Sequence, residues 1–444
     1  QMAGQTWDDH DRSGRFVARD FGQNYLMTLQ EEGNPIIFTN GDNDTFPLWY
    51  NQETEGFRTD ARTCNLSYLQ TDWYIDQMKR PAYDSPSLPI TWDRVEYVEG
   101  QNEYIPIRPE VKKNIDQMYA QADSALENGN PEVMNELKEQ FGENPYELKN
   151  ILKYWVRSDK EGLRVIPTDS IVMKIDKEAV RRSGMKIPEA LGDSIPEYMT
   201  ILLRDANGSP KRALYKSELM MLEMLANANW ERPIYMAITV GSENHLGMDN
   251  HFMQEGLAYR FTPFDTDKLN SKIDSEKMYD NLMNKFKFGG IEKPGIYIDE
   301  NVMRMCKSYR MVVFGKLATT LIYEKKNDKA LQVLDKCMEV LPPENVPLDY
   351  SGLTIGESYY LLGEKEKGHN ILKAIGDNSL RNLNWYFRLT PKQFASAASD
   401  VNSDLYTLQE VIKITKDKDP ELTKLYQEEF DNFRMALSSL QPKE

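Results

Sequence analysis

The sequence predicts an α/β domain followed by an all-α domain. Three observations support this prediction. β-prone runs alternate with helical patterns up to about residue 300, a long helical stretch interrupts them, and the β signal disappears from about residue 301. Alternating strands and helices are typical of a sheet covered by helices. We therefore expect an α/β domain over residues 1–300, with a helical insertion at about residues 110–160, and a helical domain over residues 301–444.

Two strand–helix units stand near the start of the chain. Residues 35–39 form a short apolar run, and a helical pattern from Pro47 to Gly56 follows it. Residues 61–66 form a second β-prone run, and the helical pattern after it ends at Lys79. Two such units in quick succession favour a mostly parallel, Rossmann-like sheet, in which polar loops follow the carboxyl ends of the strands.

Further strands and helices are expected before residue 301. The helical insertion is broken at Gly129-Asn130-Pro131, and the β-prone runs return after it. The final run is almost continuously apolar, as is typical of a central strand in a parallel sheet. The expected elements are strands at residues 163–167, 171–175, 200–203 and 232–239, and a helix at residues 216–229.

The helices of the second domain are expected in pairs with a weak internal repeat. Ala318 and Gly356 stand at the same distance from each other as Ala330 and Gly368. Small residues at such positions let two antiparallel helices approach closely, and the pattern resembles tetratricopeptide repeats. A third pair is expected at residues 405–440. An ordinary helical bundle is the alternative interpretation.

Composition excludes several classes of protein. Lysine and arginine number 54 against 70 aspartates and glutamates, which makes the net charge −16. Such a chain repels phosphate backbones, so no nucleic-acid partner is expected. Three cysteines without a CxxC spacing predict neither a disulfide framework nor a structural zinc site. No apolar stretch approaches the roughly 18 residues that a membrane-spanning helix needs.

The densest polar cluster lies directly after the first predicted strand. The candidate ligand-binding or metal-binding residues are Asn40, Asp42, Asn43, Asp44 and Thr45. Two carboxylates one residue apart can share a divalent cation such as Mg²⁺ or Mn²⁺, which could neutralise a diphosphate group. The alternative is a turn stabilised by Asp and Asn side chains that leads into a helix cap. No other cofactor is expected.

A second, weaker candidate metal site follows the apolar strand at residues 232–239. It consists of His245, Asp249 and His251, whose spacing matches no strong zinc pattern. The sequence contains no phosphate-binding glycine loop, no G-x-S-x-G and no catalytic Cys–His signature. The residues therefore contain no complete catalytic constellation, and catalysis by this chain alone is not expected.

Several motifs together resemble the DUF2723 family of Bacteroidetes. The longest is the run Phe38–Tyr50, and the resemblance extends over about residues 7–265. The other motifs that support it are Asp8–Arg15, Asp60–Arg62, Asn65–Ser67, Thr71–Tyr74, Trp230–Tyr235 and Glu255–Arg260.

This resemblance implies a location and a supporting role. Members of that family are large inner-membrane proteins that resemble protein O-mannosyltransferases, and this chain is similar to their soluble periplasmic part. The membrane domain is missing from it, so no transferase active site carries over. The resemblance leaves open whether a longer chain is a glycosyltransferase. It implies that this part lies on the periplasmic side of the inner membrane, next to its own upstream membrane domain.

Three functions follow as expectations. The leading one is a non-catalytic periplasmic accessory domain of a glycosyltransferase-like membrane protein, whose helical repeats bind acceptor proteins or partner subunits. The first alternative is an enzyme in which Asp42 and Asp44 hold a divalent cation and a sugar phosphate or nucleotide sugar. The second alternative is a free-standing exported scaffold protein.

Overall fold

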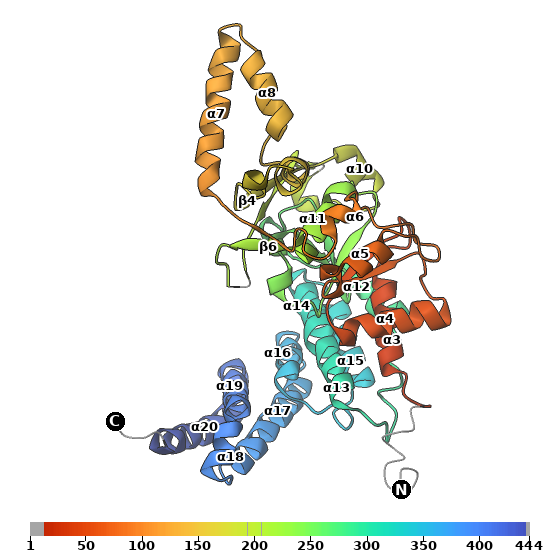
Figure 1. Ribbon diagram of the computed structural model, residues 1–444. Helices are drawn as coiled ribbons and strands as arrows, with labels where there is room; N and C mark the ends of the chain where they lie inside the picture. Colours follow the sequence, from red (N-terminus) through yellow and green to blue (C-terminus); the bar gives the residue numbers. More distant parts are fainter. Residues whose placement is uncertain (1–12, 193, 206, 441–444) are drawn as a thin grey trace. The chain divides into compact units, whose positions relative to one another are not determined.

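The computed structural model describes residues 13–192, 194–205 and 207–440 (Figure 1). Two compact units make up the chain. One, which we call the sheet unit, is Gly22–Asp274, and the other, the helical unit, is Gln1–Phe21 together with Ser275–Glu444. Residues Asp8–Arg12 of the motif Asp8–Arg15 lie outside the described residues.

The sheet unit is built around a five-stranded sheet in the order β2-β1-β7-β9-β8. Strand β1 pairs in parallel with both β2 and β7. Every residue of these three strands is buried, because helices cover a parallel sheet on both faces. The strands are β1 (Ile36–Thr39), β2 (Arg62–Asn65), β7 (Ile234–Ala237), β8 (Phe252–Gln254) and β9 (Ala258–Phe261).

The sheet is mixed, which corrects the expectation of a mostly parallel one. Strand β9 is antiparallel to β7, and β8 is antiparallel to β9. The physical reason is the connection between β8 and β9, which consists of residues 255–257 alone. So short a connection can join only antiparallel neighbours, since a parallel pair needs a crossover of a dozen residues or more.

Two small antiparallel ribbons lie apart from this sheet. Strand β4 (Ser170–Lys174) pairs with β5 (Tyr198–Leu202), so the predicted runs at 171–175 and 200–203 form their own ribbon. Strand β3 (Tyr104–Pro106) pairs with β6 (Ala213–Tyr215). The strand predicted at residues 163–167 is absent. Only Ile166 makes an isolated bridge there, because the next residue is a proline without an N–H to donate.

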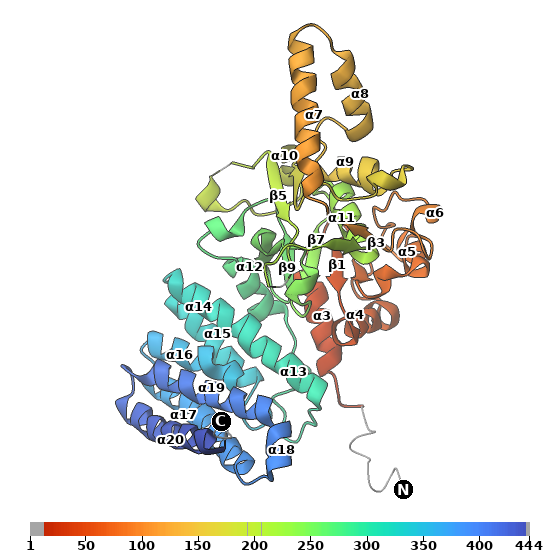
Figure 2. The same cartoon turned by 60° about the vertical axis from the view of Figure 1, so that its left-hand side comes forward.

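Helices cover the central sheet and form the insertion. Figures 1 and 2 show α7 and α8 as a hairpin that extends away from the strands of its unit. The helices before β7 are α3 (Val17–Thr28), α4 (Asp42–Glu55), η1 (Tyr68–Gln70), α5 (Asp72–Met78), α6 (Arg94–Tyr97), α7 (Glu110–Glu127), α8 (Glu132–Phe141), α9 (Leu148–Asn150), η2 (Ile151–Val156), η3 (Glu161–Leu163), α10 (Lys177–Arg182), η4 (Glu189–Leu191) and α11 (Lys216–Asn227). Three short helices follow β7, namely η5 (Ser242–Asn244), η6 (Asp249–His251) and η7 (Thr266–Lys268).

The described part of the helical unit contains helices and no strand. Helices α13, η9 and α14 follow one another without a break. Helices η9 and α14 pack against α15, and α16 packs against α17. The elements are α12 (Ser275–Asp280), η8 (Asn281–Lys285), α13 (Glu300–Ser308), η9 (Tyr309–Gly315), α14 (Lys316–Tyr323), α15 (Asn327–Val340), η10 (Tyr350–Gly352), α16 (Leu353–Leu361), α17 (Lys365–Tyr386), α18 (Pro391–Ser396), α19 (Ala398–Thr415) and α20 (Pro420–Leu440).

The first two helix pairs repeat the same turn. Lys325 follows α14 with a φ of 61°, and Gly363 follows α16 with a φ of 85°. Around each of them the same backbone hydrogen bonds recur. The N–H of Lys326 donates to the carbonyl of Leu321 at 2.8 Å, and 38 positions later Glu364 donates to Tyr359 at 2.9 Å. The two pairs are therefore structural copies at their turns.

Candidate functional site

A polar network joins the ends of the three parallel strands. Thr39 ends β1, Asn65 ends β2, and Thr239 follows β7. The Asn65 amide donates to the Thr45 hydroxyl at 2.8 Å, which also lies 2.8 Å from the Thr39 hydroxyl. Thr239 donates its hydroxyl hydrogen to the Asp44 carboxylate at 2.9 Å. The edge where ligands gather in α/β sheets is thus held together by its own side chains.

Asp44 lies inside this network. Its side chain is buried at the start of α4, which begins at Asp42 and so starts five residues before the predicted Pro47. The backbone N–H of Asn40 donates to the Asp44 carboxylate at 3.1 Å. Burial raises the pKa of Asp44, although the bonds from Asn40 and Thr239 act in the opposite direction. The carboxylate therefore serves as the acceptor that closes the loop between β1 and α4.

The other residues of the predicted site divide between this network and the solvent. Asn40 accepts a hydrogen bond from the Ser67 hydroxyl at 2.6 Å, whereas Asp42 and Asn43 are exposed. Asp42 and Asp44 stand two positions apart in the first turn of a helix, where side chains point in different directions. Across the residues that the structure describes, no group of three or more His, Cys, Asp or Glu side chains could hold a metal ion.

The three residues of the second predicted metal site do not converge on a common position where an ion could bind. His245 Nδ1 lies 2.7 Å from Asp249 Oδ1, and its Nε2 lies 3.2 Å from the carbonyl of Val240. His251 is buried between the carbonyls of Phe264 and Thr200, at 3.0 and 3.3 Å. Burial lowers the pKa of His251. Its imidazole is therefore bonded to backbone rather than directed toward the His245–Asp249 pair.

A pocket of about 450 Å³ lies beside the polar network, between α4, β2 and α5. We call it the aromatic pocket because five of its residues are Trp or Tyr. Its remaining walls are amide, carboxylate, hydroxyl and guanidinium side chains with a few small apolar ones. The lining residues are Trp49, Gln52, Glu53, Thr59, Ala61, Arg62, Thr63, Tyr68, Trp73, Tyr74, Gln77, Met78, Ala82 and Tyr83.

Rings follow one another along one wall of the aromatic pocket. The Trp49 and Tyr68 rings are 6.1 Å apart and nearly parallel, with an interplanar angle of 11°. The Trp73 ring lies 5.9 Å from the Tyr68 ring, and Phe46, which is not part of the lining, lies 5.8 Å from Trp49. Aromatic rings bury large areas at little cost in side-chain entropy. The wall therefore presents flat, preformed apolar faces next to solvent.

A guanidinium and a carboxylate line the same pocket. Arg62 is buried, and its Nη2 donates to the carbonyl of Gln77 at 3.0 Å, while its Nη1 is buried without a hydrogen-bond partner. Burial lowers the pKa of Arg62. Glu53 is exposed and accepts a hydrogen bond from the Tyr83 hydroxyl. The pocket thus carries one charge of each sign.

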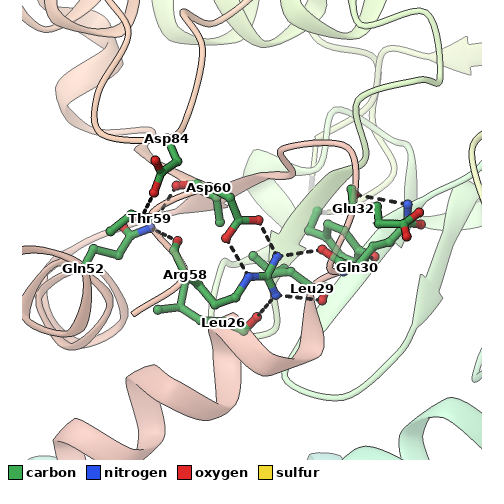
Figure 3. A network of polar contacts seen from close by, with 11 residues as sticks. Leu26, Leu29, Gln30, Glu32, Gln52, Arg58, Thr59, Asp60 and Asp84 are labelled. Atoms are coloured by element: carbon green, nitrogen blue, oxygen red, sulfur yellow. Dashed lines mark hydrogen bonds and ion pairs between the residues drawn. The ribbon is translucent and has the colours of Figure 1, made fainter. Parts of the chain in front are cut away.

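A network around Arg58 holds the loop that forms one edge of the pocket (Figure 3). The Arg58 guanidinium donates to the carbonyls of Leu26, Leu29 and Gln30 at 2.7 to 3.1 Å, and Asp60 pairs with it at 2.8 and 2.9 Å. These carbonyls lie at the C-terminal end of α3, where helical acceptors lack partners of their own. Arg58 therefore ties the α4–β2 loop to α3.

The same loop is tied to α4 and to the next loop. Gln52 donates to the carbonyls of Arg58 and Ala61 at 3.0 and 2.9 Å, and Thr59 donates to Asp84 (Figure 3). Gln52, Thr59 and Ala61 all line the aromatic pocket. Its rim is therefore fixed by hydrogen bonds before any ligand arrives.

Sequence reasoning missed the aromatic pocket. It placed the site on carboxylates and histidines, although Trp49, Trp73 and Tyr74 already stood in the motifs that it quoted. The signal that could have found the pocket is the density of Trp and Tyr after each of the first two strands. Such residues most often belong to a core, and only the tertiary contacts show that these rings line a pocket.

The comparisons with known proteins identify one family. The family model described as TMEM260-associated domain 2 matches residues 18–278, which is more than half of the chain. No curated protein and no solved structure matches. The expectation of a DUF2723 protein from Bacteroidetes is therefore wrong, since the matching family is a different one. The glycosyltransferase-like character that the resemblance implied has no support either. None of the helices described is long and apolar enough to cross a membrane.

Proposed function

Since the chain belongs to the family of TMEM260-associated domain 2, we propose that it is a non-catalytic accessory module that binds protein partners through its helical unit. The observation that carries this proposal is a set of large apolar side chains exposed on the helix pairs. Large apolar side chains in solvent favour association, because a partner that covers them removes apolar area from water. The helical unit lies almost entirely beyond the family match, which ends at residue 278.

Two of these side chains occupy equivalent positions in the repeat. Tyr323 ends α14 and is 68% exposed, and Leu361 ends α16 and is 53% exposed. We infer from this equivalence and from the repeated turns that the first two helix pairs form a tetratricopeptide-like array. Arrays of this kind present side chains in a periodic row to an extended partner segment.

The later helices add exposed side chains of the types that interfaces favour. Aromatic residues and methionine are enriched at the centre of protein interfaces, and methionine adapts its shape to different partners. These exposed residues are Trp385 on α17, Tyr406 on α19, and Leu425 and Met435 on α20.

The cysteines support a non-catalytic role. Cys64, Cys306 and Cys337 are all buried. Burial raises the pKa of each thiol to about 12. A nucleophilic cysteine acts as the thiolate, which needs a lowered pKa and access to solvent. The three thiols therefore act as small apolar core residues.

Site-specific photo-crosslinking in the native host tests the proposal. A benzophenone amino acid replaces Tyr323 or Tyr406 in the full chain, and Tyr104 on β3 of the sheet unit, which is 62% exposed, is the matched control. We expect both helical positions to give an adduct of one partner protein, and Leu361→Asp to abolish the Tyr323 adduct. Equal labelling at Tyr104, or adducts that Leu361→Asp leaves unchanged, would contradict the proposal.

Attachment to a longer protein is a second part of the proposal. The family description names a domain associated with TMEM260, which supports a module that works beside another polypeptide. The location of the chain on the periplasmic side of the inner membrane stays a prediction. Size and membrane fractionation of the native protein, detected with an antibody against this chain, test both points. A free species near 51.5 kDa that needs no detergent for release would contradict the attachment.

A further inference from the structure

We propose that the aromatic pocket of the sheet unit is a binding site for a neutral carbohydrate, independent of the partner surface on the helical unit. The pocket lies within the sheet unit, because all of its lining residues fall between Trp49 and Tyr83. Its volume of about 450 Å³ lies in the range of small-molecule sites, which is about 300–1,000 Å³.

The rings supply the first half of the recognition. Trp49 and Tyr68 are nearly parallel, and Trp73 beside them is 54% exposed. A pyranose ring has one face of C–H groups, which packs on such a flat ring by dispersion and by removal of apolar area from water. Because the rings are already in contact with one another, little side-chain entropy is lost when a sugar binds.

The polar groups supply the second half. The Arg62 guanidinium can only donate and has a buried Nη1 without a partner, whereas the Glu53 carboxylate can only accept. A sugar hydroxyl both donates and accepts, so neighbouring hydroxyls on one ring can serve both groups. Gln77, an exposed residue of the pocket lining, adds an amide that can both donate and accept.

The charge pair argues against the other ligand classes. An anion would meet Glu53 in a chain of net charge −16, and a cation would meet the desolvated Arg62. A purely apolar ligand would offer no acceptor to Arg62 Nη1 and would displace water from the exposed Glu53 carboxylate, which is costly. A proline-rich peptide packs well on aromatic grooves, but proline has no N–H to donate to Glu53. A neutral ligand rich in hydroxyl groups meets none of these objections.

Binding of the full chain to an array of neutral mono- and oligosaccharides, with a decaproline peptide as the comparison probe, tests the proposal. Titration by tryptophan fluorescence then measures the affinity of the best sugar. We expect Trp73→Ala and Glu53→Gln to weaken it by about tenfold or more. Tyr104→Ala removes an aromatic side chain of similar exposure, 62%, from β3 outside the pocket lining and should leave the affinity unchanged.

Three outcomes would overturn the proposal. The first is an array on which no neutral sugar binds above background. The second is binding of decaproline without binding of any sugar, which would make the pocket a peptide site. The third is sugar binding that Trp73→Ala and Tyr104→Ala affect equally, with the unfolding temperature of both variants unchanged. The crosslinking result on the helical unit bears on none of these outcomes.

Discussion

Gly356 in α16 and Gly368 in α17 face each other, so that the carbonyl oxygen of Gly356 lies 3.1 Å from the point where a Cβ atom would stand on Gly368. The same point lies 2.9 Å from the ring of Tyr360. On Gly356, a Cβ atom would stand 2.7 Å from Leu372 Cγ. Two residues without side chains therefore let the helices of the second pair pack at short range, as their spacing in the sequence predicts.

Gly356→Ala should loosen this helix pair. The added methyl group has no room beside Leu372, and overpacking of this kind costs about 1–3 kcal/mol, against a gain of about 1 kcal/mol in helix propensity. Native-state hydrogen exchange of peptides from α16 and α17 should show faster local opening. Gly162→Ala, where a Cβ atom meets nothing within 4 Å, is the control. Unchanged exchange in Gly356→Ala would mean that the helices separate easily.

Asp44→Asn should change how stability depends on pH. Burial raises the pKa of Asp44 above its usual value of 3.8, so the folded state holds this proton more tightly than the unfolded state. The resulting penalty is absent below pH 3.8 and complete above the raised pKa. Urea denaturation between pH 3.5 and about 8 measures the free energy of unfolding of both proteins. As pH rises, that of the wild type should fall relative to that of Asp44→Asn. An opposite slope would show that the bonds from Asn40 and Thr239 outweigh burial. Asp42→Asn, at an exposed position, is the control and should shift stability by less than about 0.5 kcal/mol.

Arg58→Ala should destabilise the sheet unit by about 2–4 kcal/mol, because three carbonyls and Asp60 lose a charged partner. Arg58→Lys should rescue little, since an ammonium cannot reproduce the planar fork of the guanidinium. Urea denaturation measures both effects. The exposed Arg80 offers a matched control, and Arg80→Ala should stay within about 0.5 kcal/mol of the wild type. A loss of similar size in both alanine variants would contradict the role assigned to Arg58.

Titration calorimetry with MgCl₂ and MnCl₂ should show no saturable binding to the Asn40–Thr45 loop. The Asp44 carboxylate already accepts bonds from Asn40 and Thr239, and a hard cation would have to displace them. Saturable heat that Asp42→Asn or Asp44→Asn abolishes would contradict this and would restore the metal-dependent alternative.

Much of the sheet unit could be predicted from local patterns. The β-prone runs at 35–39, 61–66 and 232–239 became β1, β2 and β7. Strands β1 and β7 are mainly apolar, as is typical of strands buried on both faces, whereas β2 is Arg-Thr-Cys-Asn and buries polar side chains. Strands β8 and β9 were not predicted. Each strand has only three or four residues, too few to show an alternation of apolar and polar residues. Their pairing depends on the path of the loop at 255–257, which joins them.

The candidate site divides in the same way. Aspartates after a strand predict a polar loop, and Asp44 does close one at the strand ends. Whether Asp42 or Asp44 points inward depends on the residue at which α4 begins. If the helix began a few residues later, the two side chains would point in other directions. The aromatic pocket needs Trp49 and Tyr68 to meet from different elements, and no local pattern contains that contact.

Local sequence patterns specify the order of strands and helices at the centre of the sheet unit, the paired helices after residue 300 and the small residues between them. These features rest on local propensity and periodicity, which neighbouring residues share. Three other features follow from tertiary packing alone. They are the antiparallel half of the sheet, the inward orientation of the Asp44 side chain and the pocket between α4, β2 and α5. Each of these depends on contacts between segments far apart in the chain, where packing and hydrogen bonding select one arrangement among many that local preference allows.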